Sequence, residues 1–174
     1  MCQNALITIL FIIRGILTYF FALAASTNYW TYDEWLAGIK TDTNQIDVYA
    51  RNIYNGVVPF LGERMIIECK NENKAPDNSY LLKLEGIINQ INSADSKIVK
   101  IGMIVSRKRP VQTIKTLSRL YYANTGVVIL TITTDEIRGL IYNRENLLEL
   151  LERKHDEIVL GVLSDMKGKG LFDA

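Results

Sequence analysis

The fold of this chain is decided by two stretches of sequence, Ile46-Asp47-Val48 and Met65-Ile66-Ile67-Glu68-Cys69-Lys70-Asn71. Each is mostly apolar and is bounded by polar or turn-forming residues, which is the pattern of a β-strand. Strand side chains alternate between two faces. Glu68 and Lys70 are therefore expected on one face of their strand, with Cys69 on the other, toward a packed layer. The sequence predicts a hairpin in which an acid and a lysine are neighbours.

The two strand carboxylates suggest a metal site for phosphodiester hydrolysis. That reaction requires neutralised charge on the phosphoryl oxygens and an attacking water held in line. Mg²⁺ prefers oxygen ligands and usually takes one or two carboxylates plus substrate phosphate. We expect Asp47 and Glu68 to bind Mg²⁺ or Mn²⁺, with the backbone carbonyl of Cys69 as a further ligand. Lys70 is expected to orient or deprotonate the water and to offset charge on the phosphate.

The motif Glu68-Cys69-Lys70 is short and occurs by chance in many proteins. Its setting is less common, because an acid and a lysine beside a core strand are costly to bury without partners. The alternative is an exposed ion pair on a half-exposed hairpin, which would contribute little to stability. Convergence of Asp47, Glu68 and Lys70 on one site is the arrangement that the enzymatic interpretation requires.

These residues resemble the signature of the restriction-endonuclease-like superfamily, an aspartate followed by Asp/Glu-x-Lys, and within it the Mrr-like branch. Asp47 matches the aspartate, Glu68 the acidic position and Lys70 the lysine. Cys69 and Asn71 complete a Glu-Cys-Lys-Asn motif that is often seen in that branch. The similarity runs from about residue 28 to about residue 152. It implies an α/β fold, with a mixed β-sheet flanked by helices, and a metal-dependent DNA endonuclease activity.

The chain departs from the family pattern at one position. Many members carry a glutamate on the first helix that adds to the metal site, whereas the segment before Asn28 contains no acidic residue. Glu34 is the nearest candidate, but it follows the expected helix. This departure keeps a second hypothesis open, a DNA-binding module of the same fold that is catalytically weak or inactive.

Length and cysteine content indicate an ordinary globular protein. A chain of 174 residues is most simply one domain. We expect an apolar N-terminal helix over 1–27, a nuclease-like domain over 28–160 and a tail over 161–174. Cys2 and Cys69 occupy dissimilar positions and make no disulfide framework, which favours a reducing compartment such as the cytoplasm. The single histidine, His155, excludes a His-Cys zinc cluster and a histidine-based nuclease centre.

Positive charge is concentrated in one part of the chain, although the net charge is only +1. The segment 96–134 has seven basic residues and no acidic one, namely Lys97, Lys100, Arg107, Lys108, Arg109, Lys115 and Arg119. Such segregation suits a polyanion such as DNA. We expect Arg107, Lys108, Arg109, Lys115 and Arg119 to bind nucleic acid, together with Lys74 from the loop after the metal site. A solvated charge run is the alternative.

Residues 5–26 are almost entirely apolar, with Arg14 as the one charged residue. Three interpretations stay open: the first helix of the core, a membrane anchor, or a signal peptide. The length would span a bilayer, but an arginine near the middle is costly there. A signal peptide would need a positively charged region before the apolar run, and none precedes it.

Hydrophobic spacing in the second half of the chain predicts helices that alternate with buried strands. Helices are expected over 80–91, from Pro110 to Gly126, and over 143–157, and strands over 101–106 and 127–133. Fully apolar strands joined by helices are typical of a partly parallel sheet. A homodimer would suit double-strand cleavage, but no sequence feature identifies an interface.

Overall fold

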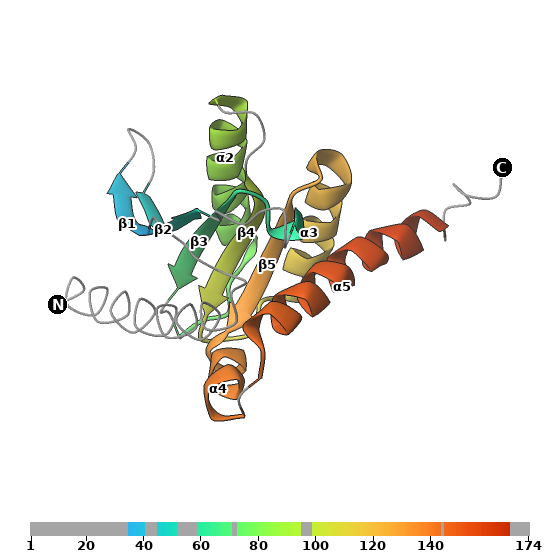
Figure 1. Cartoon of the computed structure of the whole chain (residues 1–174). Coiled ribbons are helices and arrows are strands. Elements are labelled where there is room, and N and C mark those ends of the chain that lie inside the picture. The colour runs from blue at the N-terminus through green and yellow to red at the C-terminus, as the bar shows by residue number, and fades with distance from the viewer. Residues whose placement is uncertain are drawn as a thin grey trace.

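A computed structural model describes residues 35–40, 45–51, 59–70, 73–94, 99–143 and 145–167. Within these ranges a five-stranded sheet forms the centre of the molecule, in the order β1-β2-β3-β4-β5 (Figure 1). Its strands are β1 (Trp35–Lys40), β2 (Gln45–Arg51), β3 (Arg64–Lys70), β4 (Val99–Ser106) and β5 (Val128–Thr133). The helices are η1 (Pro59–Leu61), α2 (Asn78–Ala94), α3 (Gln112–Thr125), α4 (Thr134–Tyr142) and α5 (Leu147–Lys167).

The sheet combines an antiparallel and a parallel half. β1 pairs antiparallel with β2, and β2 pairs antiparallel with β3, as strands that follow one another in the chain can do. β3, β4 and β5 pair parallel, and the helical connections α2 and α3 provide the crossovers that parallel pairing requires. The predicted α/β class, a mixed sheet flanked by helices, is confirmed, and this architecture agrees with a restriction-endonuclease-like fold.

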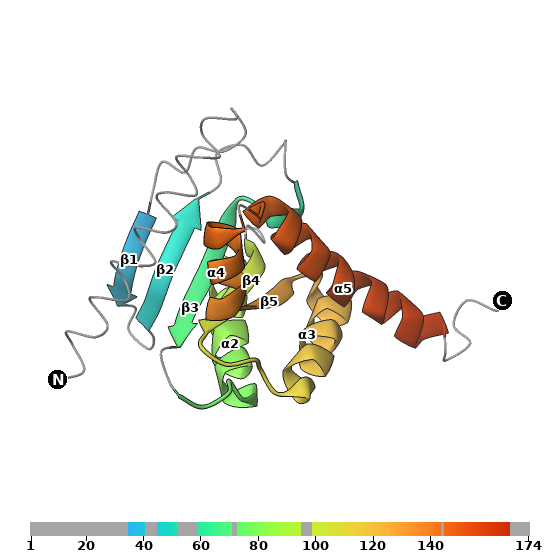
Figure 2. The ribbon, with the colours of Figure 1, turned by 90° about the horizontal axis from the view of Figure 1, so that it is seen from below.

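Helices cover both faces of the parallel half of the sheet. Figure 2 shows α2 and α3 on one side and α5 on the other. Ile66 and Ile104 pack with the α2 residue Leu84, whereas Ile67 and the α5 residue Leu151 belong to a second cluster on the opposite face. Strands buried on both faces carry near-continuous apolar runs. A polar side chain near the end of β3, such as that of Glu68, is therefore surrounded by packed apolar residues.

The close approach of α2 to β4 depends on Gly102. A Cβ atom at this position would lie 2.6 Å from Ile88 Cδ1 and 3.1 Å from Leu84 Cδ2. We expect Gly102→Ala to lower the free energy of unfolding by about 1–3 kcal/mol, because the added methyl group overpacks a buried contact. Urea denaturation of the purified variant measures this change.

Gly86 offers the matched control for that variant. It lies on the exposed side of α2, where an added Cβ has no atom within 4 Å. Gly86→Ala should raise the free energy of unfolding by about 0.5–1 kcal/mol, because glycine is unfavourable inside a helix. Equal destabilisation by the two substitutions would contradict the packing explanation for Gly102.

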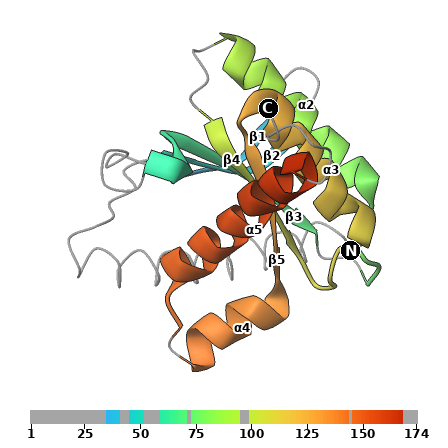
Figure 3. The same ribbon diagram turned by 90° about the vertical axis from the view of Figure 1, so that its right-hand side faces the viewer.

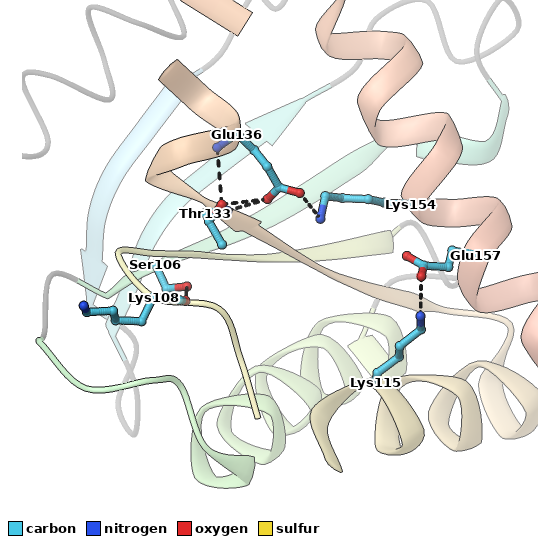
Figure 4. Close-up of polar contacts among 7 residues, drawn as sticks. All are labelled: Ser106, Lys108, Lys115, Thr133, Glu136, Lys154 and Glu157. Carbon is cyan, nitrogen blue, oxygen red and sulfur yellow. Dashed lines mark hydrogen bonds and ion pairs between the residues drawn. The ribbon is translucent and has the colours of Figure 1, made fainter. Parts of the chain in front are cut away.

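The C-terminal helices differ from the sequence prediction. A single helix over 143–157 was expected, but α4 begins at Thr134 and α5 continues to Lys167. Thr133 caps α4: its hydroxyl accepts a hydrogen bond from the backbone N–H of Glu136, whose carboxylate accepts one from the N–H of Thr133 (Figure 4). This reciprocal cap starts a helix directly after the strand, a position at which hydrophobic spacing gives little warning.

The expected tail from residue 161 is wrong over its first part, because these residues continue α5 (Figure 3). Gly161 and Val162 are buried, so tertiary packing holds this segment in a helix despite its glycine. A Cβ atom at Gly161 would clash with the guanidinium group of Arg119. The glycine therefore allows α5 to lie close to the arginine of α3.

The expectation for residues 5–26 falls outside the described residues. Among the helices that the structure does describe, none combines the length and the apolar character needed to cross a bilayer.

Candidate active site

Asp47, Glu68 and Lys70 meet near the C-terminal end of β3. Glu68 and Lys70 are among the last residues of β3, and β2 pairs beside them with Val48 opposite Ile67. The backbone N–H of Cys69 donates a hydrogen bond of 2.8 Å to Asp47 Oδ2. The register of β2 on β3 and this hydrogen bond thus fix the Asp47 carboxylate beside Glu68.

Glu68 is the centre of the site and is almost fully buried, with 1% of its side chain exposed. Its Oε1 accepts hydrogen bonds from two lysines, Lys70 Nζ and Lys83 Nζ, each at 2.6 Å. Its Oε2 is buried and has no hydrogen-bond partner among the described residues. A buried carboxylate oxygen without a partner is costly. The exposed hairpin ion pair that the sequence left open therefore does not describe Glu68.

The surroundings of Asp47 disfavour its negative charge. Burial raises the pKa of the Asp47 carboxyl, and the nearby Glu68 raises it further, although the hydrogen bond from Cys69 and the charges of Lys70 and Lys83 act in the opposite direction. Burial, with Asp47 and Glu68 beside it, also raises the pKa of the Cys69 thiol to about 12. Two carboxylates that repel each other in a partly buried site would be stabilised by a cation placed between them.

The donor set fits a hard divalent cation. In the described part of the chain, no group of three or more His, Cys, Asp or Glu side chains is arranged to hold a metal ion. Mg²⁺ needs fewer protein ligands, because it keeps several of its waters and commonly binds one or two carboxylates. Asp47, the unpartnered Oε2 of Glu68 and the backbone carbonyl of Cys69 are the groups that could hold it.

The ring of Tyr80, in the first turn of α2, lies close to the ammonium groups of two lysines. Lys70 Nζ lies 4.9 Å from the ring centroid and Lys74 Nζ lies 5.5 Å from it, both within the range of a cation–π interaction. Lys74 also lies 3.7 Å from Asp77. The predicted phosphate ligand Lys74 is thus brought to the same aromatic ring as Lys70.

Lys83 is a member of this site that the sequence analysis missed. It lies on α2, and its ammonium reaches Glu68 from the helix above the sheet. The available signal was its spacing, because Lys83 follows Tyr80 by three residues and precedes Ile87 by four. Residues so spaced share one helix face. A lysine on the sheet-facing side of an amphipathic helix is an indication of a buried acidic partner.

Apart from Lys74, the basic residues predicted to bind nucleic acid divide into two groups. Arg107, Lys108 and Arg109 are exposed and directly follow β4, whose last residue, Ser106, pairs with Lys70 of β3. The Ser106 hydroxyl donates a hydrogen bond of 2.8 Å to the Lys108 carbonyl and so shapes the turn (Figure 4). This loop lies at the same end of the sheet as the candidate active site.

The second group consists of Lys115 and Arg119, and both side chains contact α5. They do not extend the exposed basic surface of the loop. Lys115 pairs with Glu157 (Figure 4), and Arg119 Nη1 lies 3.5 Å from Asp165 Oδ2. Their spacing of four residues on α3 was correct evidence for a shared face, but that face packs against a helix. We therefore leave both residues out of the candidate nucleic-acid surface.

No protein family matches the sequence, and no curated protein sequence matches it either. Two solved structures are similar in architecture. A repair endonuclease from Pyrococcus abyssi has a TM-score of 0.45 at 10% identity, covering 69% of this chain and 46% of that one. A complex of EndoMS with double-stranded DNA has a TM-score of 0.42 at 14% identity, covering 57% and 36%. This chain therefore spans less than half the length of either, and its function is inferred from the geometry of its own site.

Proposed function

We propose that this protein is a metal-dependent endonuclease that hydrolyses DNA phosphodiester bonds, of the restriction-endonuclease type and with Mrr-like character in its Glu68-Cys69-Lys70-Asn71 segment. One observation carries the proposal. The buried Glu68 leaves Oε2 without a protein partner among the described residues, beside a second carboxylate and two ammonium groups. Such an arrangement is expensive as a purely structural feature and suits the binding of a divalent cation and a phosphate.

The roles follow from the position of each group. When bound by Asp47 and Glu68, Mg²⁺ or Mn²⁺ would supply a Lewis acid for the phosphoryl oxygens and polarise a water. As an ammonium, Lys70 orients that water and offsets the charge that builds on the phosphate. To take up the proton of the water, it must first release one of its own protons to solvent. The water oxygen bonds to phosphorus while the bond from phosphorus to a sugar oxygen breaks, and the departing oxygen receives a proton from solvent. Asp47 and Glu68 keep their positions through β2–β3 pairing.

DNA is the proposed partner because cationic side chains flank the site. Arg107, Lys108 and Arg109 are exposed at the end of β4, and Lys74 lies near Lys70. Lysine and arginine side chains bind phosphates largely without regard to sequence. They would hold the DNA backbone beside the two carboxylates.

The decisive experiment is incubation of the full chain with supercoiled plasmid in the presence of Mg²⁺, Mn²⁺ or a chelator. We expect nicked or linear DNA only when the cation is present, because without it the two carboxylates repel the phosphate and no Lewis acid polarises the water. Agarose gel electrophoresis over time measures the rate. Absence of cleavage with either cation, for a folded protein that binds DNA, would overturn the proposal.

A second candidate is a DNA-binding module of the same fold without catalysis. Two observations favour this candidate. Among the described residues the site has two acidic side chains, and the sequence before Asn28 contains no acidic residue. Filter binding across a range of salt concentrations distinguishes the two functions. Binding that falls steeply with salt, together with intact plasmid in both cations, would support the binding module.

A further inference from the structure

The two lysines on Glu68 are more than the neutralisation of one carboxylate requires. Lys70 and Lys83 both donate to the same oxygen, Oε1, at 2.6 Å, although Glu68 carries a single negative charge. Together the two ammonium groups balance the charges of Glu68 and Asp47, yet both bond the same oxygen of Glu68. The placement of both lysines on Oε1 therefore calls for an explanation beyond charge balance.

The lysines differ in how they are anchored. Lys70 is the last residue of β3, beside the open end of the sheet, and its ammonium also approaches the ring of Tyr80. Lys83 lies inside α2, next to Leu84, which is fully buried against the sheet. The packed helix fixes the backbone of Lys83, although its side chain is the more exposed of the two, 36% against 18%. Lys70 is the better placed to reach a substrate, because it lies at the strand end beside the exposed basic residues 107–109.

A task at the substrate requires Lys70 to leave Glu68. If Lys70 were the only partner, its departure would leave a buried carboxylate without a counter-charge, which is strongly unfavourable. Lys83 removes this obstacle because its hydrogen bond to Oε1 persists. The four charged groups Asp47, Glu68, Lys70 and Lys83 also sum to zero when all are ionised, so a divalent cation would leave the site net positive for an anionic transition state.

We propose that Lys83 is a positioning residue that keeps Glu68 Oε1 bound, so that Lys70 can turn to the water and phosphate while Oε2 stays directed to the cation. This inference rests on the proposed nuclease function and assigns a division of labour within it. Lys70 acts on the reacting atoms, and Lys83 acts through Glu68.

The test replaces the ammonium of Lys83 while keeping the length of the side chain. We expect Lys83→Met to lower kcat on plasmid DNA by about 10- to 100-fold, the usual effect of losing a partner that orients a metal ligand. KM for DNA should stay within about threefold, because Lys83 is not proposed to bind the DNA backbone. Lys83→Arg keeps the charge on α2 and should recover most of the rate.

Metal binding provides a readout independent of activity. Calorimetric titration with Mn²⁺ should show that Lys83→Met binds the ion at least as tightly as the unchanged protein, because a positive charge near the site has been removed. Lys154→Met is the matched control, since Lys154 donates to the half-buried Glu136 at 2.7 Å elsewhere in the fold. This control should lose stability but retain its turnover.

The outcomes separate this inference from the function on which it depends. Failure of the unchanged protein to cut DNA would overturn both. Cleavage by the unchanged protein together with equal kcat for Lys83→Met would overturn the role of Lys83 alone. That role is also overturned if Lys83→Met loses Mn²⁺ binding, or if a folded Lys83→Arg is as slow as Lys83→Met.

Discussion

Glu68→Gln is expected to reduce cation-dependent DNA cleavage by at least about 1,000-fold, which corresponds to about 4 kcal/mol of transition-state stabilisation. The substitution keeps the size of the side chain and leaves an oxygen that can accept a hydrogen bond from a lysine. It removes the negative charge that would hold the cation, together with the unpartnered carboxylate oxygen, Oε2. Asp47→Asn should have an effect of the same order, because it removes the second charged ligand.

The measurement is the initial rate of plasmid nicking at saturating Mg²⁺ and again at saturating Mn²⁺. Circular dichroism and urea denaturation show whether the variant is folded. The cost to stability should be modest, because Lys70 and Lys83 have side chains that are 18% and 36% exposed and remain hydrated when Glu68 loses its charge.

Glu136→Gln serves as the matched control for Glu68→Gln. Glu136 is a half-buried glutamate that, like Glu68, is bonded to a lysine, but it also accepts a backbone N–H and caps α4. Its replacement should cost about 1 kcal/mol of stability through the weakened cap and leave cleavage unchanged. Undiminished nicking by either Glu68→Gln or Asp47→Asn would remove the carboxylates from the mechanism.

Lys70→Met is expected to lower turnover by about 100- to 10,000-fold, the range typical of losing a group that assists proton transfer. Binding of Mn²⁺ should persist, because both carboxylates remain and Lys83 still holds Glu68 Oε1. Lys70→Arg should not restore the rate fully, because a planar guanidinium group neither gives up a proton nor reproduces the point charge of an ammonium.

Single-turnover cleavage at saturating Mn²⁺ measures the chemical step for these variants, and calorimetric titration measures the affinity for the ion. A Lys70→Met variant that loses affinity for the cation, yet cleaves at the normal rate once the cation saturates, would contradict the assigned role. Such a result would make Lys70 a residue that shapes the metal site.

Local pattern in the sequence was sufficient for most of the fold. Apolar runs between turn residues predicted β2, β3, β4 and β5, and three- and four-residue spacing predicted α2 and α3. Gly126 ends α3 with φ of 72°, a left-handed conformation that glycine adopts easily. The errors fell on α4 and on the second half of α5, where a side-chain cap and helix–helix packing outweigh hydrophobic spacing.

The sequence by itself determined which residues alternate along β3, and hence that Glu68 and Lys70 share one face. Only the tertiary structure decided that this face lies beneath α2, that Lys83 is the second partner of Glu68, and that Lys115 and Arg119 turn toward α5. The physical reason is the distance along the chain over which each effect acts. Alternation and helical periodicity are properties of neighbouring residues, whereas a buried charge is satisfied by whichever oppositely charged group the packing of distant elements brings within hydrogen-bond distance.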